Sequence, residues 1–334
     1  MSNAKSSSAL PTISVVTPIY NEEASLERYA QAIETELFSN SGINVEIILV
    51  DDGSDDSSWS IIEDLCARDP RYKGLRLSRN FGAHAALSAG ILSAGGDAVA
   101  TLAADLQDPV SVINEFVDGW RAGAQIVWGR RRSREDESWR VLTSGVFFRL
   151  VRRYAMPRGS KFATGSFFLI DRRVADCFKQ FPERNRITFA LVAWTGFRQA
   201  SVEYDRRGRG AGKSGWSFAR MLKAMYDTFI GFSEVPARLM TITGIVTSLL
   251  SVPFSLYLVT SWWLTDTVPG WTGLMLGVTV FFGLQFLMMG LVGEYLYRIY
   301  SEVTARPLFF ISQEAGQEVS QEVADIVTQA KRDA

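Results

Sequence analysis

Acidic and polar side chains stand directly after several predicted strands, and together they could hold a metal ion. The groups in these positions are Tyr20-Asn21-Glu22, Asp51-Asp52, and Asp105 with Gln107 and Asp108. Carboxylates that gather at one edge of a sheet repel one another, and a divalent cation that carries a diphosphate would supply the missing positive charge. The structural alternative is that Asp and Ser at strand ends only cap helices and form turns, which we favour for Ser54, Asp55 and Asp56.

An alternation of strand and helix patterns must position these side chains. Strands are predicted over 13–18, 45–50, 74–77, 98–102 and 125–129, and helices over 22–37, 59–68 and 83–94. This order predicts an α/β domain whose parallel sheet is covered on both faces. Ligands of such sheets bind beyond the carboxyl ends of the strands, so the polar groups are expected to share one edge.

Several functional classes are disfavoured by what the sequence lacks. His84 is the only histidine, which excludes His-dependent triads and multi-His metal sites. No G-x-G-x-x-G follows the first strand, and no P-loop motif is present. The net charge of −1 gives no indication of a nucleic-acid partner. Cys66 and Cys177 match no metal or redox spacing and are expected to be reduced thiols.

Two long uncharged stretches near the C-terminus predict membrane spans. No charged residue lies between Arg238 and Asp266, and none lies between Asp266 and Glu294. A helix of about 27 residues is roughly 40 Å long, more than the hydrocarbon core of a bilayer. Basic residues lie outside this pair of stretches and none lies in the loop 265–270, so both flanking parts are expected in the cytoplasm. A buried hairpin of core helices is the alternative.

Two further features suggest that the ligand is bound to a membrane. The basic run 129–134 follows a predicted strand, and arginine forks match the oxygens of a lipid phosphate. A solvated basic face, or contact with anionic headgroups, are the alternatives. The segment 216–234 carries an apolar stripe at helical spacing, which is typical of an interfacial helix, although a core-facing helix fits nearly as well.

Four motifs together resemble the family 2 glycosyltransferases. They are Ser14–Glu23, Val50–Ser54, Leu77–Gly82 and Ala104–Pro109. Their order and spacing are similar to those of the polyisoprenyl-phosphate branch, which includes dolichyl-phosphate mannose synthases and bactoprenol glucosyltransferases. The segments 209–214 and 293–300 extend the resemblance, which covers about residues 11–312.

The resemblance implies a GT-A-type fold, a Rossmann-like and mostly parallel α/β sheet domain followed by an interfacial helix and two transmembrane helices. The implied organisation is a disordered N-terminus over 1–10, a cytoplasmic glycosyltransferase domain over 11–215, the interfacial helix over 216–234, spans over 235–264 and 271–297 around an external loop over 265–270, and a cytoplasmic tail over 298–334.

The resemblance also implies roles for individual residues. The nucleotide pocket would be lined by Pro18, Tyr20, Glu22 and Asp51, with Asp52 close to the base or ribose. Mg²⁺ or Mn²⁺ would be held on the donor diphosphate by Asp105 and Gln107. The acceptor phosphate would be clamped by Arg131, Arg140 and Ser144, and Arg209 would lie on a loop that closes over the donor. Separately, Asp171 follows a strand predicted over 164–168 and is either a base or orienting carboxylate, or an ordinary strand-end aspartate.

One departure from the family pattern affects the metal site. The usual Asp-x-Asp reads Ala103-Ala104-Asp105, so its first carboxylate is absent. Asp108 would compensate, or the ion would rely on the donor phosphates and water. The loop after Arg209 also has Gly215 where the family commonly has lysine.

The resemblance implies inverting transfer of a hexose, with glucose from UDP-glucose to undecaprenyl phosphate at the cytoplasmic face of the plasma membrane as the leading hypothesis. GDP-mannose or a modified arabinose donor is the first alternative. A processive polysaccharide synthase is disfavoured, because its Gln-x-x-Arg-Trp motif is missing. A weakened sugar-nucleotide-binding scaffold is a different class, suggested by Ala103. The resemblance also hints at a homo-oligomer.

Overall fold

The computed structural model describes residues 10–132, 166–183, 186–206, 270–304 and 306–316, with scattered positions between 240 and 260. The chain divides into two compact units, one formed by residues up to 222 together with those from 307 onward, and one formed by 223–306. The expected N-terminal segment 1–10, apart from residue 10, and the expected interfacial helix 216–234 lie outside the described residues.

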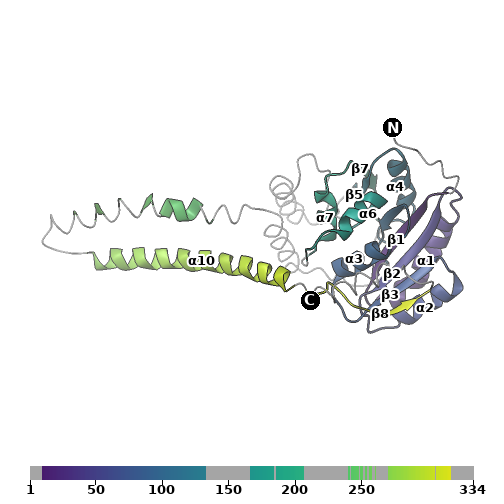
Figure 1. Cartoon of the computed structure of the whole chain (residues 1–334), viewed down its shortest axis with the longest axis horizontal. Coiled ribbons are helices and arrows are strands. Elements are labelled where there is room, and N and C mark those ends of the chain that lie inside the picture. Colours follow the sequence, from purple (N-terminus) through teal and green to yellow (C-terminus); the bar gives the residue numbers. More distant parts are fainter. Residues whose placement is uncertain are drawn as a thin grey trace. The chain divides into compact units, whose positions relative to one another are not determined.

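The first unit alternates strands and helices, as the sequence predicts (Figure 1). Its first half contains β1 (Thr12–Ile19), α1 (Glu23–Ile33), the π-helical turn η1 (Glu34–Phe38), β2 (Asn44–Asp51), α2 (Ser58–Arg68), β3 (Tyr72–Leu77), α3 (Ala83–Ser93) and β4 (Ala98–Thr101). The rest contains α4 (Val112–Arg121), β5 (Ile126–Arg131), β6 (Phe168–Asp171), α6 (Arg172–Lys179), α7 (Thr188–Trp194), β7 (Gln199–Tyr204) and β8 (Ile311–Ala315).

The strands form one mostly parallel sheet with the order β7-β5-β6-β4-β1-β2-β3-β8. β1 pairs in parallel with β2 and β4, β2 with β3, and β5 with β7. β6 and β8 run antiparallel to their neighbours. The predicted α/β fold is confirmed, and the carboxyl ends of β1, β2, β3, β4, β5 and β7 share one edge, which we call the carboxyl edge.

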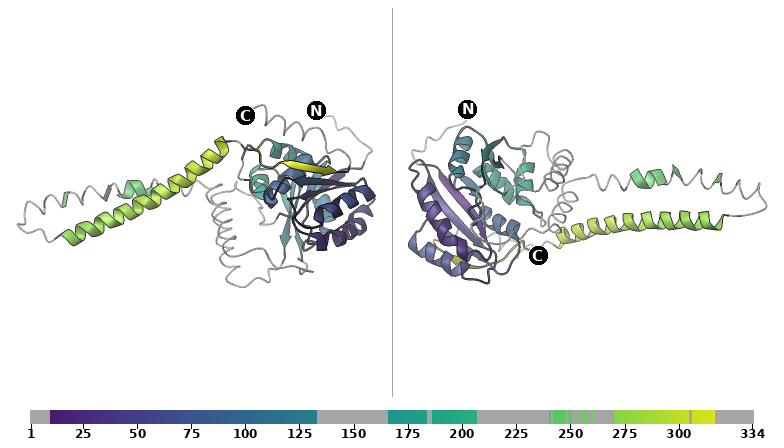
Figure 2. Two further views of the ribbon diagram at one scale, coloured as in Figure 1. Left: turned by 90° about the horizontal axis from the view of Figure 1, so that it is seen from below. Right: turned by 180° about the vertical axis from the view of Figure 1, so that it is seen from behind.

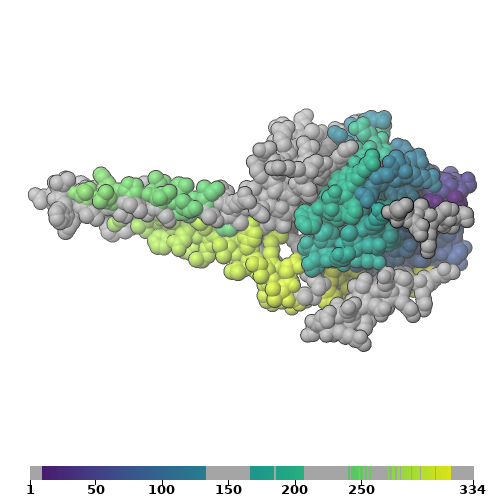
Figure 3. Space-filling view, turned by 45° about the horizontal axis from the view of Figure 1, so that its top comes forward, coloured from purple at the N-terminus to yellow at the C-terminus, as the bar shows by residue number. Residues whose placement is uncertain are grey.

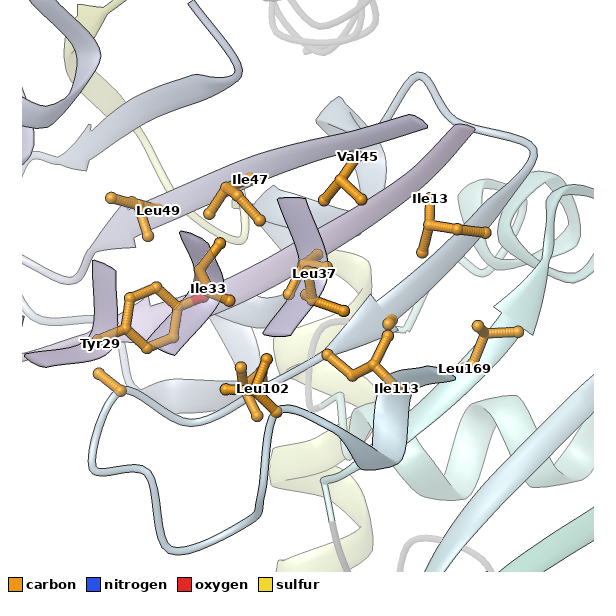
Figure 4. Packing of buried hydrophobic residues seen from close by; sticks show 14 of the residues in the cluster. Ile13, Tyr29, Ile33, Leu37, Val45, Ile47, Leu49, Leu102, Ile113 and Leu169 are labelled. Atoms are coloured by element: carbon orange, nitrogen blue, oxygen red, sulfur yellow. The ribbon is translucent and has the colours of Figure 1, made fainter. Parts of the chain in front are cut away.

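Apolar side chains cover both faces of the sheet, which explains the continuous apolar runs of its central strands. On one face, residues of β1 and β2 pack against α1 and α4, as Figure 4 shows for Ile13, Ile33, Ile47 and Ile113. On the other face lies α3, whose residues from Ala85 to Ser93 are all buried.

One expectation about a strand is corrected by the structure, and one further strand is found. The strand expected over 164–168 begins at Phe168 and ends at Asp171. The segment 298–334, expected as a cytoplasmic tail, contains β8, which pairs with the outer edge of β3 (Figure 2). Five residues with little apolar character, Ile-Ser-Gln-Glu-Ala, give no strand signal by themselves, so only pairing with β3 makes them a strand.

Glu46 joins three strands at the edge opposite to the carboxyl edge. Its carboxylate accepts hydrogen bonds from the Ser14 hydroxyl, from Lys73 Nζ at 3.0 Å, and from the backbone N–H groups of Gly95 at 2.7 Å and Gly96 at 3.2 Å. Burial alone would raise the pKa of Glu46, but these hydrogen bonds and the charge of Lys73 together hold the pKa below its usual value.

Glu46→Gln is therefore expected to destabilise the protein in a pH-dependent way. A carboxylate whose pKa is lowered on folding stabilises the protein above its unfolded-state pKa, and this contribution is lost as the pH falls through the folded-state pKa. We expect the substitution to lower the free energy of unfolding by about 1–3 kcal/mol near pH 7 and by much less near pH 3. Urea unfolding of both proteins at the two pH values measures the difference, and an equal loss at both would contradict the prediction.

In the second unit, α10 (Trp271–Val303) is one helix of 33 residues (Figure 1). Among the described residues, the part Val280–Val303 is long and apolar enough to cross a membrane. Large apolar side chains such as Phe286 and Met289 are exposed along it. Most of the first expected span, 235–264, and the loop 265–269 lie outside the described residues, so the arrangement with two spans stays a prediction.

Candidate active site

A polar cavity of about 540 Å³ opens at the carboxyl edge, beyond the ends of β1, β2 and β3. Its lining residues come from the ends of these strands, from the loops that follow them, and from β8: Tyr20, Gly53, Ser54, Asp55, Arg76, Leu77, Ser78, Arg79, Asn80, Ser312 and Gln313. Two arginines and several amide and hydroxyl groups suit an anionic ligand with hydrogen-bonding edges, and the exposed ring of Tyr20 offers a surface for stacking.

The loop after β1 is held against the loop after β2 by reciprocal hydrogen bonds. Asn21 N–H donates to Ser54 Oγ at 2.9 Å, and Asp55 N–H donates to Asn21 Oδ1 at 3.0 Å. Glu22 N–H donates to Ser58 Oγ at 3.0 Å. Asn21 takes a positive φ of 54°, a conformation that Asn tolerates better than most residues. These contacts fix the position of Tyr20 at the wall of the cavity.

Asp51 lies beneath the cavity and acts on it through Arg76. Its side chain is fully buried, and Oδ1 accepts from the Ser54 N–H at 3.1 Å. Oδ2 forms an ion pair of 3.2 Å with Arg76 Nε, without hydrogen-bond geometry. Arg76 also donates to the Ser54 carbonyl at 3.2 Å. A buried carboxylate thus holds the guanidinium at the cavity wall.

Asp52 shapes the loop after β3. Its two carboxylate oxygens accept the backbone N–H groups of Phe81 at 2.7 Å and Gly82 at 2.8 Å. Burial raises the pKa of Asp52, although these two hydrogen bonds favour the charged form. Gly82, with a φ of 98°, takes a conformation that few other residues would accept. Asp52, which we expected close to the base or ribose, therefore holds the loop that carries Ser78, Arg79 and Asn80.

Asp105 and Gln107 follow β4 at the same edge. Asp105 is half-buried and Gln107 is buried, and Asp105 Oδ1 accepts the Gln107 N–H at 3.2 Å. Leu106 between them has a positive φ of 53°. Carboxylate and amide oxygens are suitable ligands for Mg²⁺ or Mn²⁺. Within the described ranges, no three His, Cys, Asp or Glu side chains gather as a metal site. One carboxylate and one amide oxygen would fit an ion that takes its other ligands from phosphate and water.

Asp108, expected as a possible substitute ligand, is engaged elsewhere. Its Oδ1 is 2.5 Å from the Tyr204 hydroxyl, 3.8 Å from Arg131 Nη2 and 4.0 Å from Arg206 Nε. Arg131 Nε also donates to the Tyr204 hydroxyl at 3.4 Å. Burial, and then the charge of Asp108, raises the pKa of Tyr204, so the phenol stays protonated and donates. Asp108 and Tyr204 thus orient Arg131 at the end of β5.

Tyr204→Phe is expected to cost about 1.5–3 kcal/mol of stability, because Asp108 loses a hydrogen bond in a buried setting. If Arg131 holds an acceptor phosphate, the KM for that acceptor rises severalfold while the KM for the donor stays unchanged. Urea unfolding and steady-state kinetics measure the two effects. The matched control is Tyr72→Phe, since the buried Tyr72 hydroxyl has no hydrogen-bond partner within the described residues and its removal should be nearly neutral. Equal losses in the two variants would contradict the prediction.

Asp171 does not belong to this edge, which corrects its expected role as a base or orienting carboxylate. β6 is antiparallel to β4, and Asp171 is paired with Ala98, the first residue of β4, whereas Asp105 follows the last residue. The carboxylate caps α6 by accepting the Arg173 N–H at 2.9 Å, and it accepts Trp120 Nε1 at 2.7 Å. Asp171 is a structural strand-end aspartate.

His84 also has structural contacts. Its Nδ1 accepts the Thr188 N–H at 3.4 Å, and its ring centroid lies 5.4 Å from that of Phe189. Burial lowers the pKa of His84 to about 4, so the ring is neutral near pH 7. Both partners, Thr188 and Phe189, belong to α7, and Figure 3 shows the surface around α6 and α7 in teal.

The remaining predicted residues are placed as follows. Pro18 lies within β1 beside Val50, and Glu22 immediately precedes α1, where its Oε2 accepts the Ser25 hydroxyl at 2.8 Å; neither lines the cavity. Arg140, Ser144 and Arg209 lie outside the described residues.

The sequence patterns did not indicate three residues that line the cavity, namely Arg76, Ser312 and Gln313. Arg76 could have been found from its place at the end of a strand beside Asp51. Ser312 and Gln313 carried no signal, because their pairing with β3 depends on contacts far apart in the chain.

Several known proteins are similar to this chain over nearly its whole length. The profile of Glycosyl transferase family 2 matches residues 14–178. An uncharacterized glycosyltransferase from Synechocystis is 39% identical over 312 residues, which cover 92% of this chain and 96% of that protein. The bactoprenol glucosyl transferase of Shigella phage SfII is 33% identical over 90% of this chain and 97% of its own length. A prophage bactoprenol glucosyl transferase homolog from Escherichia coli is 32% identical, with 90% and 98% covered.

Proposed function

Because this chain belongs to glycosyl transferase family 2, we propose that it transfers a hexose from a nucleotide sugar to a polyprenyl phosphate. Glucose from UDP-glucose is the proposed donor group and undecaprenyl phosphate the proposed acceptor. The observation that carries this proposal is the match with a bactoprenol glucosyl transferase over 308 residues, which must include residues of both units.

The donor would lie along the carboxyl edge. The polar cavity beside β2, β3 and β8 would take the nucleoside, with Tyr20 and Arg76 at its wall. Only β1 lies between β2 and β4 in the sheet, so an extended nucleotide sugar that starts in this cavity would run along the carboxyl edge toward Asp105. Arg79, which also lines the cavity, adds positive charge for the phosphates.

Asp105 and Gln107 would hold a divalent ion on that diphosphate. When bound, such an ion supplies a Lewis acid that neutralises the charge on the departing nucleoside diphosphate. Asp105 contributes the carboxylate, and the short turn through Leu106 fixes it relative to Gln107.

Arg131 would hold the acceptor phosphate in line with the anomeric carbon. Its guanidinium is oriented by Asp108 and Tyr204 and is about one-third exposed, so it keeps a surface for phosphate oxygens. The phosphate is already ionised near pH 7 and attacks without a general base, which agrees with the position of Asp171 at the opposite edge. Positioning of the two substrates and electrostatic stabilisation of the leaving group would provide most of the rate enhancement.

The position of β8 supports the proposal of two spans. β8 follows α10 in the chain and pairs with β3, so the segments before and after the second unit must lie on the same side of any membrane. A single crossing by α10 would put β8 on the wrong side, whereas an even number of crossings would not. In this proposal the first unit is cytoplasmic.

Transfer of label into the organic phase tests the function. The purified full chain is incubated with undecaprenyl phosphate, Mg²⁺ or Mn²⁺, and labelled UDP-glucose, GDP-mannose or other nucleotide sugars. Label from UDP-glucose alone supports the proposal in full. Label from another donor keeps the reaction and changes the sugar, and donor binding without transfer would favour the weakened scaffold suggested by Ala103.

A further inference from the structure

A β-bulge in β8 places two consecutive side chains at the cavity. Arg76 is paired with Gln313, but the next residue of β3, Leu77, is paired with Ile311, so Ser312 is an extra residue in the ladder. Side chains normally alternate between the two faces of a strand, and a bulge changes the direction of one of them. Here both Ser312 and Gln313 line the cavity.

Side-chain contacts tie these two residues to the same arginine. Arg76 Nη1 donates to Gln313 Oε1 at 3.2 Å, and the Ser312 hydroxyl donates to the Arg76 carbonyl at 3.1 Å. With its oxygen held by Arg76, the Gln313 amide presents its NH₂ group as a hydrogen-bond donor. An NH₂ donor beside a guanidinium suits the carbonyl oxygen of a nucleobase such as uracil or guanine.

Phe310, the residue before β8, contacts the loop after β3. Ser78 N–H donates to the Phe310 carbonyl at 2.8 Å, and the rings of Phe310 and Phe81 are 6.4 Å apart. The loop that carries Ser78, Arg79 and Asn80 is therefore held by Asp52 on one side and by the segment before β8 on the other.

We propose that β8 completes the donor pocket, with Gln313 donating to a carbonyl of the nucleobase and Ser312 fixing the backbone of Arg76. The inference rests on the proposed function, because it takes the cavity to be the nucleoside site. Only residues 304–310 separate α10 from β8, so the chain that leaves the predicted span forms a wall of this site. Nucleotide binding and docking of β8 then stabilise each other, since a ligand stabilises the state that binds it.

The test is calorimetric binding of UDP and GDP to the detergent-solubilised full chain, its Gln313→Ala variant and a matched Glu314→Ala variant. Glu314 is on the same strand, exposed, and does not line the cavity. Q313A is expected to weaken binding of the preferred nucleotide about tenfold, or 1.4 kcal/mol, and E314A to leave it within about twofold. Both variants should keep the wild-type melting temperature, because neither side chain is buried.

Hydrogen exchange gives a second readout that does not depend on a substitution. The preferred nucleotide is expected to slow exchange of the amides of residues 311–315 in the wild-type chain. Tight nucleotide binding by Q313A together with unchanged exchange in β8 would overturn the inference and leave the proposed function standing. The expected binding and exchange results without sugar transfer would support β8 and count against the proposed function. A wild-type chain that binds neither UDP nor GDP would overturn both.

Discussion

Asp105→Asn is expected to lower kcat by about a thousandfold at saturating donor and acceptor. Where the family usually has its first carboxylate, this chain has Ala103. Asp108 is hydrogen-bonded to Tyr204 and paired with Arg131. Asp105 therefore provides the carboxylate on which the proposed metal depends. An amide keeps the size of the side chain but removes its charge. The measurement is transfer of labelled sugar to undecaprenyl phosphate over a range of Mg²⁺ and Mn²⁺ concentrations, which also shows whether excess metal recovers activity.

The matched control is Asp171→Asn. Asp105 follows β4 and Asp171 is the last residue of β6, but Asp171 caps α6 at the opposite edge of the sheet. Asn is also a good N-cap, so D171N is expected to change kcat by less than about twofold. Its single amide oxygen can accept only one of the two hydrogen bonds from Arg173 N–H and Trp120 Nε1, so we expect the free energy of unfolding to fall by about 1–3 kcal/mol. A D171N variant as impaired as D105N, or a D105N variant with near wild-type turnover, would show that the assignment of the site to the carboxyl edge is wrong.

Arg76→Met is expected to reduce stability by about 3 kcal/mol, the lower end of the range for breaking a buried ion pair. Asp51 is fully buried, while the Arg76 side chain is about one-third exposed, so part of the lost charge can be replaced by water. The same substitution removes a cation from the cavity wall, and nucleotide binding is expected to weaken about tenfold or more. Urea unfolding and calorimetric binding of UDP measure the two effects.

A second substitution separates stability from binding. Asp51→Asn combined with Arg76→Met removes the uncompensated charge, so most of the stability should return while the binding defect remains.

Arg79→Met is the control for stability, because Arg79 lines the same cavity but lies over the Phe81 ring, 4.1 Å from its centroid. It should cost only about 0.5–1 kcal/mol. Failure of the double variant to recover stability would show that the ion pair is not the cause of the loss.

The sequence by itself determined the strand and helix pattern of the first half of the chain. The predicted strands over 13–18 and 45–50 agree with β1 and β2 to within a residue or two at each end. The rule that ligands bind at the carboxyl ends of parallel strands also brought Tyr20, Asp51 and Asp105 to one edge. These features depend on local periodicity and on the order of elements along the chain, both of which a sequence carries directly.

Only the tertiary structure decided the direction and partners of the strands. The sequence left Asp171 as either a base or orienting carboxylate or a strand-end aspartate, and the antiparallel pairing of β6 puts it at the edge opposite to Asp105. Ser312 and Gln313 became part of the cavity because β8 pairs with β3 across more than two hundred residues of chain. Asp108 was available as a metal ligand in sequence, but the fold brings Tyr204 and Arg131 to it. Pairing between distant segments is selected by the packing of the whole sheet, and a local pattern of residues does not contain that information.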